Sequence, residues 1–512
     1  METWLFTIIT LAASLLLKSL LNLFSQPEKH SHPLPPGPPK FPIIGSLLWL
    51  RKSFREFEST FCSLHKQLGP IITLYVGSRP MIFIADRFLA HQALIQSGAV
   101  FADRPPSSAI NKISNCNQHN ISSSFYGPTW RLFRRNLTSE ILHPSRVKSY
   151  SHARKWALEI LFDRLDSQSK SGDHPVGVQA NFQFSIFCLL VLMCIGDKLD
   201  QKQIEEIERA QRSAIVNFRR LEKLNIMPRL TKIVFRKFWS EFLQIQKQRE
   251  EVLIPLIRAR KKANEERKIN NFNDGFVLSY VDTLFDLQLP DEKRNLREKE
   301  MVALCNEFLN AGTDTTSTAL QWIMANLVKY PEIQEKLYME IKQVVDDAEE
   351  EVKEDDLQKM PYLKGVILEG LRRHPPGHFV LHHAVTEDFV LDKFMIPKNA
   401  NVNFMVAKMG WDPNTWEDPM AFKPERFTGD GEVFDITGSR EIKMMPFGVG
   451  RRMCPAYGLA LLHLEYFVAN LVWKFEWKAM DGYDIDLSEK LEFTTMMKNP
   501  LQAIISPRFQ NQ

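Results

Sequence analysis

The sequence predicts a mainly α-helical fold with a small β portion, preceded by a single N-terminal membrane helix. Long segments with the periodicity of helices follow one another through most of the chain. Residues 70–86 contain two β-type runs around a Gly-Ser turn. The first 24 residues are almost continuously apolar, and about 20 such residues suffice to span a bilayer as a helix.

The bulk composition favours an ordinary enzyme or binding protein. The chain has 512 residues, of which 44% are hydrophobic and 25% charged, as in folded globular proteins. A net charge of +4 is too small to indicate a nucleic-acid partner. The six cysteines are scattered and form no CxxC pair, which argues against a disulfide framework or a zinc ribbon. We expect Cys188 and Cys194, in the apolar run FSIFCLLVLMCIG, to pack in the core.

Residues 1–24 are predicted to be an uncleaved transmembrane anchor. A cleaved signal peptide is the alternative, but this segment starts with an acidic residue, whereas signal peptides begin with basic ones. Excess positive charge marks the cytosolic side of a membrane helix. The basic residues that follow the apolar run are Lys29, Lys40, Arg51 and Lys52. We therefore predict a cytosolic catalytic portion, with the sequons at Asn120 and Asn136 free of sugar.

Residues 25–45 are predicted to be a proline-rich hinge, and residues 46–512 a single catalytic domain. Prolines fix φ and lack a donor, so HPLPPGPPKFPIIG is an extended connector instead of a helix or central strand. The domain shows no internal repeat and no second linker. Short β-like pieces are expected at 379–405 and near the C-terminus. Helices are expected at 145–167, 178–196, 201–221, 231–267, 297–329, 332–347, 361–373 and after Cys454.

Three segments rich in charged residues are interpreted next. The charge run at 258–268 is expected to be a solvated helix end or loop, and the acidic run at 346–356 a surface loop. Residues 223–239 mix basic and bulky apolar side chains. That segment either touches the membrane surface near the anchor or packs as a helical hairpin.

The segment PFGVGRRMCPAYG, residues 446–458, carries the strongest chemical signal. Cys454 precedes a proline and an apolar helical run, so we expect it at a helix N-terminus, where the dipole lowers a thiol pKa. Glycines in front of it let the backbone approach a flat partner. Arg452 can pair with a carboxylate, and Phe447 supplies an aromatic face. A thiolate, a close backbone, an arginine and an aromatic ring together suit a single-thiolate haem site.

These residues resemble the cysteine-loop signature of the cytochrome P-450 family, the haem-thiolate monooxygenases. Phe447, Gly450, Arg452 and Cys454 match Phe-x-x-Gly-x-Arg-x-Cys-x-Gly, whereas Ala456 replaces the usual last glycine. The resemblance covers nearly the whole chain and is closest to the eukaryotic microsomal branch, with plant-like wording. It implies the cytochrome P-450 fold, with a long central helix over haem b and the cysteine loop beneath. Cys454 would then be the axial ligand of the iron.

Residues 311–316, AGTDTT, lie inside a helical run and resemble the family's oxygen-activation motif. Gly, Asp and Thr have low helix propensity. Ser and Thr hydroxyls can also bend a helix by donating to the carbonyl of the preceding turn. An ordinary helix with an outward polar face is the alternative. The resemblance implies that Asp314 and Thr315 deliver protons during oxygen activation. It also implies that Ala311 and Gly312 leave room for the haem and oxygen.

Other matches concern the haem propionates. The run WRLFRR places Trp130 and Arg134 one helical turn apart, and in the family this pair contacts a propionate; a basic surface helix is the alternative. His383 falls where the family often has an arginine or histidine for a propionate, and His382 stands beside it. The stretch FADRPP, residues 101–106, also matches the family.

A further set of residues resembles the family's structural salt-bridge triad. Glu369 and Arg372, in EGLR, share a helix face at i and i+3. Arg426, in FKPERF, would complete the triad behind the cysteine loop.

The resemblance implies a monooxygenase in the endoplasmic reticulum membrane. It would insert one oxygen atom from O2 into a small, largely apolar substrate by hydroxylation or epoxidation, with electrons from NADPH through a reductase. Two alternatives are an oxygen-independent isomerase or dehydratase of the same family, and a haem-binding sensor without turnover. A third takes Cys454 as a nucleophile, which needs a neighbouring histidine base, and His463 is nine residues further on.

Overall fold

The computed structural model describes most of the chain. The described residues are 32–38, 54–76, 79–169, 174–217, 220–221, 223–225, 228–270, 277–346, 348–429 and 433–508, together with Thr10 and Ser14. Apart from those two residues, both helical, the predicted anchor at 1–24 lies outside this set. Only residues 32–38 of the predicted hinge are described, and they contain no helix or strand, as the prolines predict.

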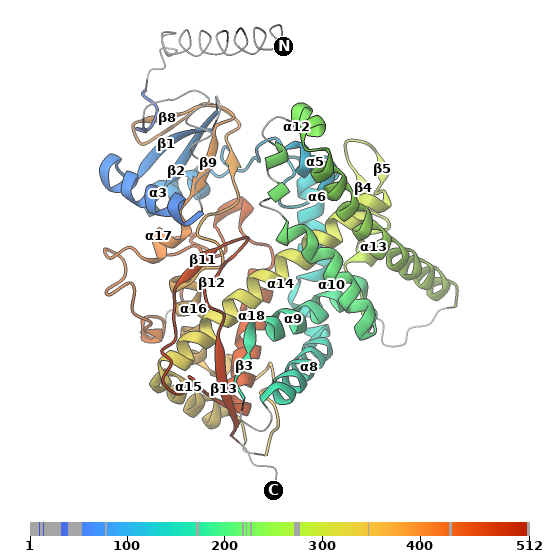
Figure 1. The fold of residues 1–512 in the computed structure, drawn as a ribbon, viewed down its shortest axis with the longest axis vertical. Coiled ribbons are helices and arrows are strands. Elements are labelled where there is room, and N and C mark those ends of the chain that lie inside the picture. Colours follow the sequence, from blue (N-terminus) through green and yellow to red (C-terminus); the bar gives the residue numbers. More distant parts are fainter. Residues whose placement is uncertain are drawn as a thin grey trace, which may run out of the picture.

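Helices make up the larger part of the molecule (Figure 1). The longer helices, except α3, fall where the hydrophobic pattern predicts them. They are α3 (Phe54–Leu68), α8 (Ser151–Ser169), α9 (Val178–Ile195), α10 (Gln201–Val216), α13 (Arg236–Asn270), α14 (Glu298–Lys329), α15 (Pro331–Val344), α16 (Pro361–Arg373) and α18 (Tyr457–Lys474). Shorter ones are α4 (Arg87–His91), α5 (Ala109–Ser114), α6 (Pro128–Asn136), α7 (Pro144–Ser149), α12 (Pro228–Val234) and α17 (Val406–Gly410).

Local sequence signals set several helix ends. Asp200 caps α10 with a full capping box, in which its side chain accepts from the Gln203 amide and Gln203 reciprocates. Pro128 opens α6, where its missing N–H costs nothing. Gly196 ends α9 in the left-handed region with φ of 88°. These capping residues in the sequence therefore account for the start of α6 and α10 and the end of α9.

Strands form one mixed sheet and several smaller ones. The largest has the order β1 (Ile71–Val76), β2 (Arg79–Ile84), β9 (Asn401–Phe404) and β6 (His383–Ala384), with β2 and β9 parallel. A second joins β10 (Phe475–Lys478), β13 (Gln502–Pro507) and β3 (Val176–Gly177). Three hairpins pair β4 (Gln288–Leu289) with β5 (Arg294–Asn295), β7 (Phe389–Leu391) with β8 (Phe394–Ile396), and β11 (Glu489–Leu491) with β12 (Thr495–Met497).

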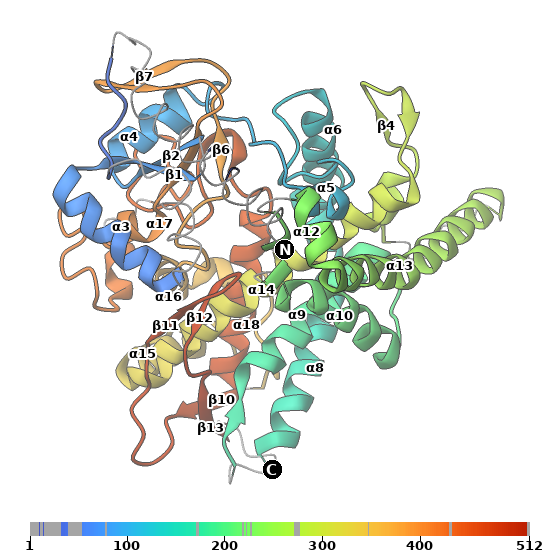
Figure 2. The same cartoon turned by 45° about the horizontal axis from the view of Figure 1, so that its top comes forward.

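The main core is helical, and α14 runs through its middle. Figures 1 and 2 show α14 crossing the molecule with α9, α16 and α18 packed around it, and the β1–β2–β9 sheet set to one side. Cys188 and Cys194 are buried in α9, as predicted. Within the described residues, α9 is the one helix long and apolar enough to cross a membrane. Because 83% of that window is buried inside the fold, α9 is a core helix.

Two surface assignments need correction at single residues. The run 258–268 lies on α13, but Arg260 is only 1% exposed and pairs with Asp282 at 2.7 Å. The fold tolerates the buried charge of Arg260 because both carboxylate oxygens of Asp282, which is itself almost fully buried, accept hydrogen bonds from its guanidinium. The acidic run 346–356 is a loop as predicted, yet Glu354 bonds at 2.6 Å to Arg154, which is fully buried.

Candidate functional site

Cys454 lies in a loop that the backbone closes tightly. The Cys454 N–H donates to the Phe447 carbonyl at 2.8 Å. Gly448 and Gly450 have φ of 65° and 73°, a region that favours glycine. A Cβ at Gly450 would lie 2.2 Å from the Leu94 carbonyl oxygen. The glycines thus allow the tight turn of the loop, and Gly450 allows its close contact with the backbone of Leu94.

The helix after Cys454 begins later than the sequence predicts. α18 starts at Tyr457, so Pro455 precedes the helix instead of occupying its first turn. Burial raises the pKa of the Cys454 thiol, while a hydrogen bond from the Ala456 amide and the charge of Arg134 lower it. The net direction is opposite to the sequence prediction, because burial outweighs the two favourable contacts. A thiolate at this sulfur therefore depends on a positive ion binding to it.

Three arginines gather on one side of the loop. Arg452 donates to the carbonyls of Ala102 and Ser124 at 2.6 and 2.7 Å. Burial, reinforced by the charges of Arg104 and Arg134, lowers the pKa of Arg452 to about 9. Burial also lowers the pKa of Arg104 to about 10 and that of Arg134. Buried like charges repel, so this cluster is arranged to receive negative charge.

Trp130 adds an unpaired donor beside the arginines. Its ring is 7% exposed and lies 4.5 Å below the Arg452 guanidinium. The indole Nε1 is buried and has no hydrogen-bond partner within the part of the chain described. A buried unsatisfied donor costs about 1–3 kcal/mol. A haem offers an iron to the Cys454 sulfur and two propionate carboxylates to Trp130, Arg134 and Arg452. These residues therefore fit a haem.

The two predicted histidines lie beside the same cluster. His383 is buried on β6 and its Nδ1 donates to the Phe101 carbonyl at 2.6 Å. Burial, then the charge of Arg104, lowers the pKa of His383 well below its usual range, so it is neutral. His382 has an exposed side chain although protein atoms crowd it closely enough to lower its pKa to about 4.

The AGTDTT segment lies in the middle of α14, which is helical throughout. Thr315 Oγ1 donates backwards to the Ala311 carbonyl at 2.6 Å. Ala311 is exposed, whereas Thr313 is buried. A Cβ at Gly312 would lie 2.7 Å from Leu190 on α9. The missing side chain of Gly312 therefore allows α9 and α14 to approach each other closely.

Asp314 is held from a neighbouring helix. Gln183 on α9 donates its side-chain amide to Asp314 Oδ1 at 2.6 Å. Burial raises the pKa of Asp314, and the bond from Gln183 and the charge of Arg212 oppose this. A carboxyl group with a raised pKa gains and loses a proton near neutral pH more readily than an ordinary aspartate. The arrangement suits proton transfer.

The predicted salt-bridge triad is confirmed. Glu369 and Arg372 pair at 2.7 Å with both side chains fully buried, and Arg426 Nε lies 3.3 Å from Glu369. Arg372 also donates to the carbonyls of Gly410, Pro419 and Ala421. The triad thereby ties α16 to the segment 410–426 that leads into the cysteine loop.

Sequence reasoning missed two residues of this site. Arg104 belongs to the matched stretch FADRPP, but no role was derived for it; it is 7% exposed and donates to the carbonyls of Ser122, Leu381 and His382. Gln183 sits in the apolar run of α9 and carries no sequence signal. Its partner lies 131 residues away, so only the fold brings the two together.

No histidine joins Cys454 as a base among the described residues. His463 is 2% exposed, and burial lowers its pKa to about 3. Its Nε2 has no partner in the described part of the chain. The nucleophile interpretation of Cys454 thus receives no support from the geometry.

Comparison with known proteins agrees with this arrangement. A family model described as Cytochrome P450 matches residues 35–505. Cytochrome P450 89A9 of Arabidopsis thaliana is 52% identical over 491 residues, covering 93% of this chain and 94% of that protein. Isoflavone 3'-hydroxylase of Medicago truncatula is 30% identical, covering 98% and 97%. A solved structure of a zebra fish cytochrome P450 with progesterone matches with a TM-score of 0.73 at 21% identity, covering 88% of this chain and 99% of that one.

Proposed function

Because the chain belongs to the cytochrome P450 family of oxidoreductases, and its relatives include plant hydroxylases, we propose that it is a membrane-anchored haem-thiolate monooxygenase. It inserts one oxygen atom from O2 into a small, largely apolar organic substrate, by hydroxylation or epoxidation. Electrons come from NADPH through a haemoprotein reductase. The observation that carries the proposal is the set of groups around Cys454: a buried sulfur, three neighbouring arginines whose pKa values burial lowers, and the Trp130 indole N–H, which has no partner among the described residues.

The proposal assigns each of these groups a task. Cys454 holds the iron, and haem b bound there supplies the activation of O2 and the oxygen transfer. Trp130, Arg134, Arg452 and His383 hold the propionates. Phe447 and Gly450 shape the loop that carries Cys454 and would contact the haem.

Residues of α14 would deliver protons and leave room for oxygen. Asp314, held by Gln183, accepts protons from solvent and passes them inward. Thr315, whose hydroxyl is fixed by the Ala311 carbonyl, holds water beside the reacting oxygen. Ala311, which is exposed, would leave room for the haem and oxygen, whereas the missing side chain of Gly312 serves the contact between α14 and Leu190 on α9 instead of the predicted role. These residues distinguish the proposal from a haem sensor, which needs no proton delivery.

Exposed apolar side chains near the candidate site support the substrate class. Leu381 is 61% exposed and adjoins His382. Phe493 is 52% exposed and precedes Thr494, whose hydroxyl contacts Thr318 on α14 at 3.0 Å. Large exposed apolar side chains favour an apolar partner. Relatives named as isoflavone and germacrene A acid hydroxylases agree with such a class.

The exposed surface of α12 supports membrane attachment. Its apolar side chains Leu230, Ile233 and Val234 are 49%, 77% and 61% exposed, and Lys232 is on the same helix. An exposed apolar patch with a basic neighbour suits the interface of a bilayer. Of the two alternatives for residues 223–239, membrane contact therefore fits α12, whereas Leu224 and Trp239 pack in a small core. We propose the endoplasmic reticulum membrane, with the catalytic domain in the cytosol.

A basic surface near the cysteine loop supports a reductase partner. Arg131, Arg135 and Arg451 have exposed side chains. Arg131 and Arg451 both lie over the Tyr126 ring, at 5.1 and 5.6 Å. Positive charge on this face attracts an acidic partner and orients it toward Cys454.

The first experiment is a carbon monoxide difference spectrum of the dithionite-reduced protein beside a Cys454→Ser variant. We expect a strongly red-shifted Soret band in the parent that the variant loses. A histidine-type spectrum, or no haem, would overturn the assignment. Product formation from a substrate panel, with and without reductase and NADPH, then separates the monooxygenase from an oxygen-independent isomerase, which needs neither.

A further inference from the structure

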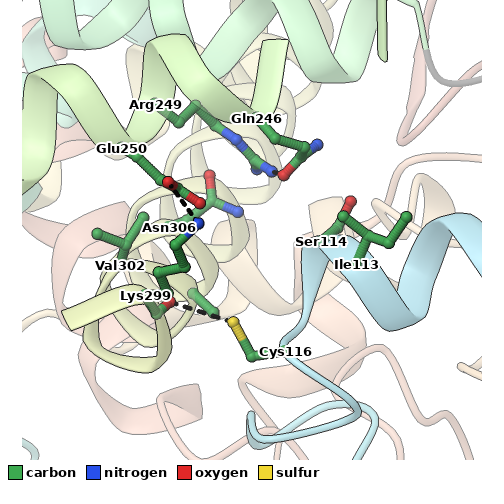
Figure 3. Close-up of a pocket in the computed structure, with 10 residues that line it drawn as sticks. Ile113, Ser114, Cys116, Gln246, Arg249, Glu250, Lys299, Val302 and Asn306 are labelled. Atoms are coloured by element: carbon green, nitrogen blue, oxygen red, sulfur yellow. Dashed lines mark hydrogen bonds and ion pairs between the residues drawn. The ribbon is translucent and has the colours of Figure 1, made fainter. Parts of the chain in front are cut away.

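The loop that follows α5 is tied to α14 at three places. Figure 3 shows the first, where the Cys116 thiol donates to the Lys299 carbonyl at 3.3 Å. At the second, His119 Nδ1 lies 2.8 Å from Glu300 Oε1. The third is Glu307, about two helical turns further along α14. This last contact differs from the other two because it continues to the candidate haem site.

Glu307 binds the loop through backbone amides. Its Oε2 accepts from the Ile121 N–H at 2.8 Å, and its Oε1 accepts from the Ser122 N–H at 2.6 Å. Both oxygens are therefore acceptors, as in an ionised carboxylate. Burial raises the pKa of Glu307, while the bonds from Ser122 and Ile121 and the charge of Arg104 oppose the rise. These contacts favour the charged form of the side chain.

One peptide unit joins Glu307 to Arg452. Its N–H, from Ser122, donates to Glu307 at 2.6 Å, and its carbonyl, from Ile121, accepts from Arg452 Nη1 at 3.2 Å. Hydrogen bonds in a chain polarise one another, so a carboxylate on the N–H makes the carbonyl a stronger acceptor. The next carbonyl, that of Ser122, accepts from Arg104 Nε at 2.7 Å. Glu307 therefore acts on two of the three clustered arginines through the backbone of the loop.

Arg452 is held in a way that leaves donors for a carboxylate. Its Nε and Nη2 donate to the carbonyls of Ala102 and Ser124 at 2.6 and 2.7 Å, and its Nη1 donates to that of Ile121. A guanidinium has five N–H groups, so these three bonds to described residues leave two. Coplanar N–H groups suit a carboxylate. The orientation of the guanidinium depends on carbonyls that lie mostly in the segment 121–124.

We propose that Glu307 is a positioning residue for Arg452, whose guanidinium it orients toward a haem propionate by fixing the backbone of residues 121–124. The inference rests on the proposed function, because it assumes a haem at Cys454. A glutamine at position 307 has one acceptor oxygen in place of two, so it cannot hold both amides. The charge of Glu307 also offsets part of the positive charge of the cluster, since it raises the pKa of Arg104 against the effect of burial.

The test is a double-mutant cycle on the rate of haem transfer from the full-length, haem-loaded protein in detergent to excess apomyoglobin. Its corners are the parent, Glu307→Gln, Arg452→Met and the double variant. Glu307→Asp, which keeps both carboxylate oxygens, tests rescue. Glu300→Gln is the matched control, because it weakens another contact between the same loop and the same helix. Urea midpoints of all variants, followed by circular dichroism, report the stability of the fold separately.

We expect Glu307→Gln to speed haem transfer about tenfold, the factor for one hydrogen bond to a charged group. Glu307→Asp should transfer haem more slowly than Glu307→Gln. In the Arg452→Met background, Glu307→Gln should change the rate less than about twofold, because its effect passes through Arg452. Glu300→Gln should lower the urea midpoint and leave the transfer rate within about twofold of the parent.

An unchanged rate in Glu307→Gln would overturn the proposal, as would equal acceleration in both backgrounds or by Glu300→Gln. Failure of both Glu307 variants to fold would also overturn it, because Glu307 then serves the fold instead of the haem site. Where Arg452→Met holds no haem, Arg452→Lys replaces it in the cycle. A parent without the red-shifted carbon monoxide band refutes the proposed function itself. A parent with that band and any of the contrary results refutes only the role of Glu307.

Discussion

Replacing Glu369 by leucine tests the triad that supports the cysteine loop. Glu369 accepts two bonds of 2.7 Å from Arg372, and it also accepts from the Lys423 amide at 2.8 Å and from Arg426. Glu369→Leu leaves Arg372 fully buried with no counter-charge. Removing one partner of a buried ion pair costs about 3–5 kcal/mol. Loss of the bond from the Lys423 amide places the expected cost toward the upper end.

The measurement is the urea midpoint of the full-length protein in detergent, followed by far-ultraviolet circular dichroism. The control is Glu251→Leu, which breaks an exposed pair with Lys247 of 3.2 Å, with side chains 67% and 56% exposed. An exposed i,i+4 pair contributes about 0.3–0.5 kcal/mol, so this variant should unfold almost where the parent does. The double variant Glu369→Leu/Arg372→Met should recover part of the loss, because no charge is then left unpaired. Equal midpoints for the two Glu→Leu variants would refute the reasoning.

Three further substitutions test the site and its surroundings. Asp314→Asn should lower product formation about 100-fold at an unchanged carbon monoxide spectrum, because a general acid–base group contributes at least that much; an unaltered rate would contradict the role. Trp130→Phe should speed haem transfer to apomyoglobin about 5- to 10-fold, the factor for one hydrogen bond. The apoprotein should keep its stability, since Nε1 has no partner in the described chain. Burial lowers the pKa of His374 to about 4, so its neutral form adds stability that is present above pH 6.5 and lost as the pH falls toward 4. Between pH 7 and 5 the parent should lose about 2 kcal/mol more than His374→Gln, as measured by urea midpoints.

The sequence predicts the fold well because its strongest signals are local. The helices α10, α15 and α16 carry a 3.6-residue apolar period, α9 is a long run of apolar residues, and some ends are marked by caps such as Asp200 and Gly196. The strands at 71–76 and 79–84 are equally local, since the sequence has two β-type runs separated by Gly-Ser. The predicted start of α18 was wrong by a few residues because a proline after Cys454 fits either the first helical turn or the turn before it.

The candidate site is predicted where it follows sequence motifs and missed where the fold alone creates it. The residues of the cysteine loop and the EGLR pair are near neighbours in the sequence. Gln183 meets Asp314 because Gly312 lets α9 approach α14, and nothing in either segment indicates that contact. The pKa of Cys454 was predicted in the wrong direction because burial, unlike a helix start, cannot be seen in the local sequence.

The fold also limits one test of topology. Asn120 is 3% exposed, and its side chain bonds to Ser122 and Ser123. A sugar on this residue is incompatible with the folded protein in any compartment. The absence of a glycan at Asn120 therefore carries no information about membrane orientation, and Asn136, which is half-buried, is the more informative sequon.

Residues 32–38 have a practical consequence for anyone who shortens this protein for crystallisation. The Pro36 carbonyl accepts from the Thr73 amide at 2.8 Å on edge strand β1, and the Pro33 carbonyl accepts from Met395 on β8 at 2.8 Å. This stretch therefore connects the edge of the four-stranded sheet to the β7–β8 hairpin. Cutting after residue 38 would expose those two amides and leave a bare strand edge that invites self-association. Cutting before residue 32 removes the proposed membrane segment and keeps both of these hydrogen bonds.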